Sequence, residues 1–186
     1  MTESSSREEL SGPTDEELWT DFVRGRDAAL DVLVQRYRTE LNWYLVLSTG
    51  KQDAAARFLR NVWAQLAAYR RPFEGFESFR SWLYAAATQN SVPATHPEMF
   101  GLTDLLDDIR RAGQASRRGK LFFHIRDMAQ AVRQPFLLVT VAGLSVTEAA
   151  KACNFSVERT WECLGKGYRR LAHTDLFRRR GGAGEV

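Results

Sequence analysis

The chain has 186 residues, of which 44% are hydrophobic and 26% are charged, and its formal net charge is +3. This composition is sufficient for a packed core and is ordinary for a soluble protein. No stretch approaches the roughly 18 to 20 apolar residues that cross a bilayer. The first residues, MTESSSREELSG, are polar and acidic, whereas a signal peptide is first basic and then apolar. We therefore expect a cytoplasmic protein without membrane insertion.

The residues that carry most enzyme and metal chemistry are sparse. Cys153 and Cys163 form no CxxC pair and have no histidine at ligand spacing, which predicts reduced thiols and no metal site. The three histidines lie away from any nucleophile and base arrangement, and no phosphate-binding glycine loop is present. The sequence therefore predicts neither an enzyme nor a cofactor.

Helix signals follow one another through the first half of the chain. Thr14 and Glu17 have the spacing of a capping box, in which each side chain accepts a hydrogen bond from an otherwise unpaired backbone N–H. Asp27 and Ser78 can cap two further helices, and a helix is predicted over 53–69 between these two. Each predicted helix has apolar residues at three- and four-residue steps, so each has one face to bury.

The second half begins after a mixed segment. Two prolines and a polar, basic stretch predict a linker over 93–120. A helix is then predicted over 121–132, and Pro135 is expected at the first position of another helix that ends at Gly143. No stretch alternates with period two for long enough to predict a strand. The expected fold class is all-α, with two small helical domains joined by a linker.

A helix-turn-helix pattern follows. Ser145 and Glu148 form a second capping box before a two-turn helix, Asn154 and Phe155 turn the chain, and Ser156 caps a longer helix. In a helix-turn-helix the second helix enters the major groove of DNA. The pattern alone also fits an ordinary amphipathic helix pair with a solvated basic face.

The longer helix contains two kinds of position. Trp161, Leu164, Tyr168 and Leu171 recur at three- and four-residue steps and predict its buried face. Side chains near the start of such a helix reach base edges, and those farther along meet phosphates. The predicted DNA-binding residues are Arg159, Thr160, Glu162, Lys166, Arg169 and Arg170.

Two ordered blocks of sequence carry a family resemblance. The first, residues 14–90, contains TDEELWTDFVRGRDAALDVLVQRYRTELNWYLVLSTG and FEGFESFRSWLYAAATQN. The second, residues 121–173, contains RQPFLLVTVAGLSVTEAAKACNFSVERTWECLGKGYRRL. Both blocks resemble the extracytoplasmic-function sigma factor family, as a divergent member. In that family the first block binds the polymerase clamp helices and melts the downstream promoter element, and the second block reads the upstream element.

The resemblance also implies domains and site residues. The implied organisation is a flexible tail (1–13), a region 2-like domain (14–92), a linker (93–120), a region 4-like domain (121–175) and a basic flexible tail (176–186). The resemblance places the promoter-melting loop at Phe73, Gly75, Phe76 and Ser78. These residues suit that role, because a flipped base needs a pocket on a loop and unpaired bases stack on aromatic rings. The implied polymerase-binding residues are Arg57, Arg60 and Asn61.

The sequence departs from the family on the surface expected to bind polymerase. The family has an acidic pair and a glutamine before its valine and phenylalanine. This chain has Ala56, Arg57 and Arg60 before Val62 and Trp63. The charge of that surface is therefore reversed in sign.

Two further departures concern DNA. After Asn90 the family continues with an aspartate and two arginines that lie along promoter DNA, whereas this chain continues SVP. In the recognition helix, Glu158, Trp161 and Cys163 occupy positions that are usually glycine, lysine and arginine. Fewer phosphate contacts predict weaker and less salt-sensitive DNA binding.

The sequence thus predicts a sigma factor-like transcription initiation factor that binds RNA polymerase core and directs it to promoter DNA, with an anti-sigma protein as a further candidate partner. Two alternatives remain. The chain could be a degenerate sigma-like DNA-binding regulator that does not support initiation, or a module that binds only other proteins. Affinity for core polymerase separates the first reading from the others, and salt-dependent DNA binding separates the last two.

Overall fold

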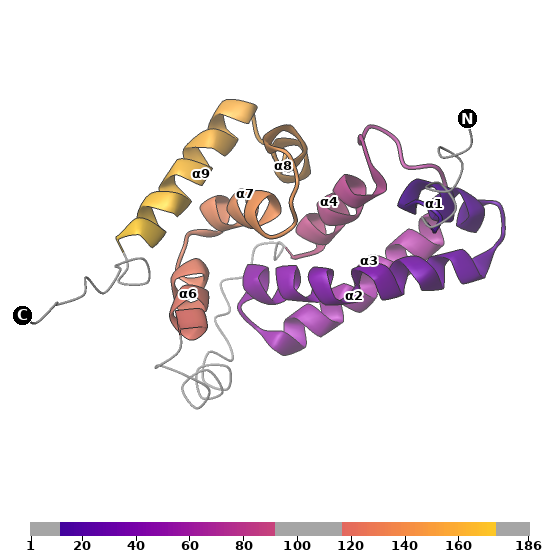
Figure 1. The fold of residues 1–186 in the computed structure, drawn as a ribbon, viewed down its shortest axis with the longest axis horizontal. Helices are drawn as coiled ribbons and strands as arrows, with labels where there is room; N and C mark the ends of the chain where they lie inside the picture. Colours follow the sequence, from indigo (N-terminus) through magenta and orange to yellow (C-terminus); the bar gives the residue numbers. More distant parts are fainter. Residues whose placement is uncertain (1–11, 92–116, 174–186) are drawn as a thin grey trace, which may run out of the picture.

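The computed structural model describes residues 12–91 and 117–173, and every regular element in these two stretches is an α-helix. This confirms the all-α class and its two helical parts (Figure 1). The N-terminal part comprises α1 (Asp15–Val23), α2 (Asp27–Thr49), α3 (Gln52–Tyr69) and α4 (Phe79–Ser91). The C-terminal part comprises α6 (Arg117–Arg126), α7 (Gln130–Thr140), α8 (Val146–Cys153) and α9 (Val157–Ala172). Most of the predicted linker and both predicted tails lie outside the described residues.

Both predicted capping boxes are formed. The Thr14 N–H donates to Glu17 Oε2 at 2.8 Å, and the Glu17 N–H donates to Thr14 Oγ1 at 3.2 Å. Ser145 and Glu148 make the same pair of hydrogen bonds at the start of α8. Ser78 accepts from the backbone of α4, and Ser156 accepts from the backbone of α9, each at 3.1 Å.

Three local predictions differ from the structure. Asp27 is the first residue of α2 and not its cap; its carboxylate is paired with Arg70 at 2.7 Å. The helix predicted over 121–132 is divided between α6 and α7, and the Arg133 guanidinium donates to the carbonyl of Arg126 at 2.6 Å where the chain turns. Pro135 lies inside α7, where its ring is buried. Its missing N–H therefore deprives the helix of one hydrogen bond.

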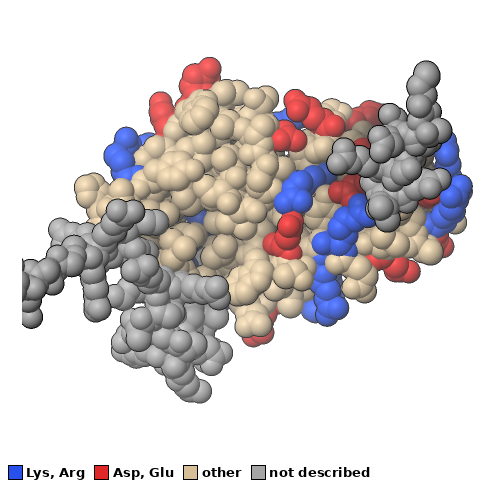
Figure 2. All heavy atoms as spheres, in the orientation of Figure 1, with Lys and Arg blue, Asp and Glu red and all other residues tan. Residues whose placement is uncertain are grey.

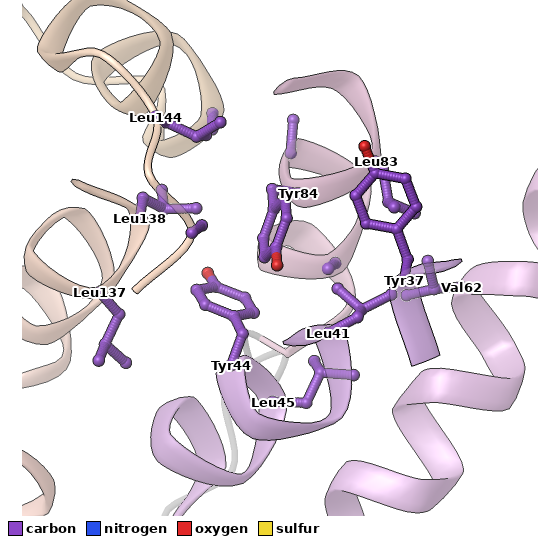
Figure 3. Packing of buried hydrophobic residues seen from close by; sticks show 14 of the residues in the cluster. Tyr37, Leu41, Tyr44, Leu45, Val62, Leu83, Tyr84, Leu137, Leu138 and Leu144 are labelled. Carbon is purple, nitrogen blue, oxygen red and sulfur yellow. The ribbon is translucent and has the colours of Figure 1, made fainter. Parts of the chain in front are cut away.

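The two helical parts share a hydrophobic core. Helix α4 packs against α2 and α3 on one side and against α8 on the other, and α2 also contacts α7. Figure 3 shows Tyr44 and Tyr84 of the N-terminal part opposite Leu137, Leu138 and Leu144 of the C-terminal part, and all five side chains are buried. The Tyr44 hydroxyl lies 2.7 Å from Thr88 Oγ1, which satisfies a polar group inside this core. The parts are therefore packed as one body.

Helix α9 approaches α7 closely at a glycine. A Cβ placed on Gly167 would lie 2.4 Å from Cδ2 of Phe136, whose ring is buried. A Cβ on Gly165, in the same helix, would come no closer than 3.7 Å to the flexible end of Arg169. The missing side chain at Gly167 thus sets the distance between the two helices.

We predict that Gly167→Ala destabilises the protein and that Gly165→Ala does not. Overpacking a core costs about 1 to 3 kcal/mol, and the helix preference of alanine over glycine offsets about 1 kcal/mol of this. Urea denaturation should give a lower free energy of unfolding for Gly167→Ala and an equal or higher one for Gly165→Ala. Equal stabilities for the two variants would show that the close packing has no energetic consequence.

Candidate nucleic-acid interface

The loop between α3 and α4 is held at both ends by α1. The Trp19 indole N–H donates to the carbonyl of Arg71 at 2.9 Å, and the Glu16 carboxylate accepts from the backbone N–H of Phe79 at 3.0 Å. Gly75, at the middle of the loop, has φ of +76°, a conformation that a side chain would strain. The loop is thus fixed in place before any ligand binds.

Phe73 lies on the side of the loop that faces α1. Its half-buried ring stacks on Trp82, with centroids 5.9 Å apart and ring planes 27° apart. Beside it is a hollow of about 460 Å³ with an aromatic wall and charged groups among its lining residues. The hollow is lined by Glu16, Trp19, Thr20, Val23, Arg24, Pro72 and Phe73. Such a surface can stack an unpaired base and hydrogen-bond its edge.

Phe76 and Ser78 face the other way, toward α8. The Lys151 ammonium lies 5.0 Å from the centroid of the Phe76 ring, within cation–π distance. The Ser78 hydroxyl donates to Glu148 at 3.4 Å, and the same carboxylate caps α8. The four residues predicted as a melting loop are therefore divided between an open side and a side covered by the C-terminal part.

The exposed residues of α9 include most of those predicted to bind DNA. Glu162, Lys166 and Arg169 are exposed. The exposed Arg159 has its guanidinium 3.9 Å from the centroid of the Phe155 ring, and Arg170 is paired with Asp127. Thr160 differs, because it is fully buried and its hydroxyl donates to the carbonyl of Ser156 at 2.9 Å.

The predicted buried face of α9 is confirmed at Leu164 and Leu171 and is wrong at Trp161 and Tyr168. Trp161 and Tyr168 are 60% and 54% exposed. The residues that face the core are Thr160, Cys163, Leu164, Gly167 and Leu171. The close approach of α9 to Phe136 at Gly167 explains the difference, because small residues must lie where the helices touch. The side chain of Trp161 is therefore directed to the surface, and Tyr168 lies at the edge of the helix contact, where its ring packs edge-to-face on Phe136 with centroids 5.2 Å apart.

The predicted polymerase surface lies on α3. Arg57, Arg60 and Asn61 are exposed, while Val62 and Leu66 on the opposite face are buried. On the face shown in Figure 2, basic side chains lie mainly over the N-terminal helices, and the surface over the C-terminal helices is mostly uncharged. Arg57 and Arg60 are therefore cationic groups at the surface of α3, and the Arg57 guanidinium lies 5.7 Å from the centroid of the Phe58 ring.

Comparison with known proteins identifies the fold. No family model matches the chain, and no curated protein matches it in sequence. The chain is similar to the solved structure of CnrH in complex with the cytosolic domain of CnrY, with a TM-score of 0.64 and 18% identity. The match covers 85% of this chain and 94% of that one. CnrH is an extracytoplasmic-function sigma factor, so this chain has the fold of that class.

The described residues contain neither a membrane-spanning helix nor a metal-binding cluster. None of the helices in 12–91 and 117–173 is long and apolar enough to cross a membrane. Within the same two stretches, no group of three or more histidine, cysteine, aspartate or glutamate side chains could hold a metal ion.

Glu148 connects the loop to α8 and should make the stability depend on pH. Burial raises the pKa of this carboxyl, but hydrogen bonds from the backbone and side chain of Ser145, and from Ser78 and Ser81, lower it below its ordinary value of 4.5. A carboxyl with a lowered pKa in the folded state stabilises the protein above its unfolded pKa, and this contribution is lost as the pH falls through the folded pKa.

We predict that wild-type protein is more stable than Glu148→Gln at pH 7 and that this difference shrinks as the pH falls below about 4.5. Urea denaturation between pH 7 and pH 3.5 measures it. Glu74→Gln, which changes an exposed loop carboxylate, is the control and should show a smaller pH-dependent difference. A difference in stability between wild type and Glu148→Gln that does not change with pH would contradict a lowered pKa for Glu148.

Proposed function

We propose that this chain is a sigma factor-like initiation factor that binds RNA polymerase core through α3 and directs it to promoter DNA through the α3–α4 loop and α9. The observation that supports this most is the presence of an aromatic loop and a capped helix-turn-helix on a fold similar to CnrH. Its role is to position the polymerase in the cytoplasm, without catalysis of its own.

The proposed function requires the two parts to separate. The downstream and upstream promoter elements are different stretches of DNA, and each part would contact one of them. In the structure Lys151 covers the Phe76 ring and α8 packs on α4, so this side of the loop cannot stack on a base. The closed arrangement is therefore the free form, and binding to polymerase opens it.

An anti-sigma protein is a proposed partner of the free form. The similar structure contains CnrH bound to the cytosolic domain of CnrY, an anti-sigma protein. A protein that holds the two parts together would stabilise the state in which Phe76 and Ser78 of the loop are covered.

A second candidate function is a sigma-like DNA-binding regulator that does not support initiation. The observation in its favour is the pair of exposed arginines, Arg57 and Arg60, on the helix expected to bind polymerase. A regulator would bind DNA but show no affinity for core polymerase.

The first test of the proposal reverses the charge on α3. We predict that Arg57→Glu and Arg60→Glu each weaken binding to the cognate core polymerase about tenfold, a loss of about 1.4 kcal/mol, because like charges would then face each other. Arg38→Glu on α2, also at an exposed arginine, is the control. Binding titrations with labelled protein measure the affinity. No binding by the wild type would favour the regulator.

The second test concerns promoter melting. We predict that Phe73→Ala reduces formation of the open complex, because stacking on an unpaired base contributes about 1 to 3 kcal/mol. Binding to double-stranded upstream DNA should stay unchanged. Permanganate reactivity of unpaired thymines reports melting, and circular dichroism reports folding, which is needed because Phe73 also stacks on Trp82. Phe123→Ala, at an exposed ring on α6, is the control. Equal loss of promoter melting and of binding to double-stranded DNA would show that Phe73 serves only the core.

A further inference from the structure

The start of α9 presents an unusual set of side chains to solvent. The helix begins at Val157 after the Ser156 cap, and the exposed residues of its first two turns are Val157, Glu158, Arg159, Trp161 and Glu162. In a helix-turn-helix such early exposed positions meet the edges of the bases. Only Arg159 among the five is of a type that pairs with guanine or adenine, and its guanidinium lies 3.9 Å from the centroid of the Phe155 ring.

Two other exposed basic residues, Lys166 and Arg169, lie farther along the same helix. Side chains at such positions meet phosphates and fix how the helix lies on the duplex. They also offset the charge of two glutamates that would otherwise be repelled by DNA.

The chemistry of the outward side chains points to pyrimidines. The indole of Trp161 is 60% exposed and is apolar apart from its Nε1–H, and the only apolar group on a base edge in the major groove is the thymine 5-methyl. Carboxylates accept hydrogen bonds from the N4 amino group of cytosine. Hydrogen bonds from its own backbone N–H and from Ser156 lower the pKa of Glu158, so this group stays ionised and acts only as an acceptor.

On the basis of the proposed function, we propose that α9 reads pyrimidines in the major groove of the upstream element. Trp161 contacts the 5-methyl group of a thymine, and Glu158 and Glu162 accept hydrogen bonds from cytosine amino groups. Trp161 is thus a specificity-determining residue at the position where the resemblance expects a lysine.

The test begins with the full-length protein and a randomised duplex library, from which the preferred sequence is selected. Each thymine of that sequence is then replaced singly by uracil, which removes only the 5-methyl group. We expect one of these replacements to weaken wild-type binding about three- to fivefold, because this is the loss in affinity expected when one buried methyl group is removed. Trp161→Ala should bind the thymine and uracil duplexes equally.

Tyr168→Ala is the matched control, because Tyr168 is a similarly exposed aromatic residue on the same helix but lies about two turns further from its start. This variant should still distinguish thymine from uracil. Glu162→Gln and Glu158→Gln should each relax the preference for cytosine at one position. Trp161 is at the surface, so its replacement should leave the circular dichroism spectrum unchanged.

The outcomes separate this inference from the proposed function. If the wild type selects a sequence but no uracil replacement matters, or Trp161→Ala still distinguishes the two bases, the inference is wrong and sequence reading by α9 stands. If the wild type selects no sequence at any salt concentration, the proposed function fails as well. Trp161 would then belong to a surface that binds protein.

Discussion

The packing of α4 between α2 and α3 of its own part and α8 of the C-terminal part is the constraint on which the other features of the structure depend. Arg80 in the first turn of α4 donates to the carbonyl of Ala142 at 2.8 Å, pairs with Glu40 at 2.8 Å, and lies beside the ring of Tyr84. It therefore joins α2, α4 and the end of α7 through one side chain. Burial raises the pKa of Tyr84 to about 12, so its hydroxyl stays protonated and neutral beside the guanidinium.

The position of α4 couples the two surfaces that would face DNA. The aromatic loop ends where α4 begins, and α8, the first helix of the helix-turn-helix, packs against the same helix. Contacts of Glu148 with Ser78 and of Lys151 with Phe76 extend this packing to the loop itself. Movement of the C-terminal part away from α4 would uncover Phe76 and Ser78 on the covered side of the loop.

Local features of this fold could be predicted from the sequence, because short-range hydrogen bonds determine them. The Thr14 and Ser145 capping boxes and the helix-turn-helix follow from side chains that bond the backbone three residues away. The buried face of α9 could not be predicted, since periodicity favours large apolar residues such as Trp161, whereas the close approach to Phe136 requires Gly167. Only a tertiary contact supplies that information.

The residues of the candidate site could likewise be predicted only where local sequence determines them. The sequence identified the aromatic loop and the exposed cations of α3 and α9, since residue type and order suffice for these. It did not indicate that Phe73 and Phe76 face opposite sides of the loop, or that Thr160 is buried, because both depend on neighbouring helices. Periodicity alone places Trp161 in the core, whereas the structure places it at the surface. The proposed recognition of the DNA sequence by α9 depends on this residue.

The most direct test of this account is the distance between the two parts, measured by pulsed electron paramagnetic resonance with and without core polymerase. Spin labels at the exposed positions Ala64 on α3 and Lys166 on α9 report it, with the native cysteines replaced by alanine. The account predicts one narrow distribution for the free protein and a longer distance for the protein bound to polymerase. A broad distribution for the free protein, or an unchanged distance in the bound one, would contradict it.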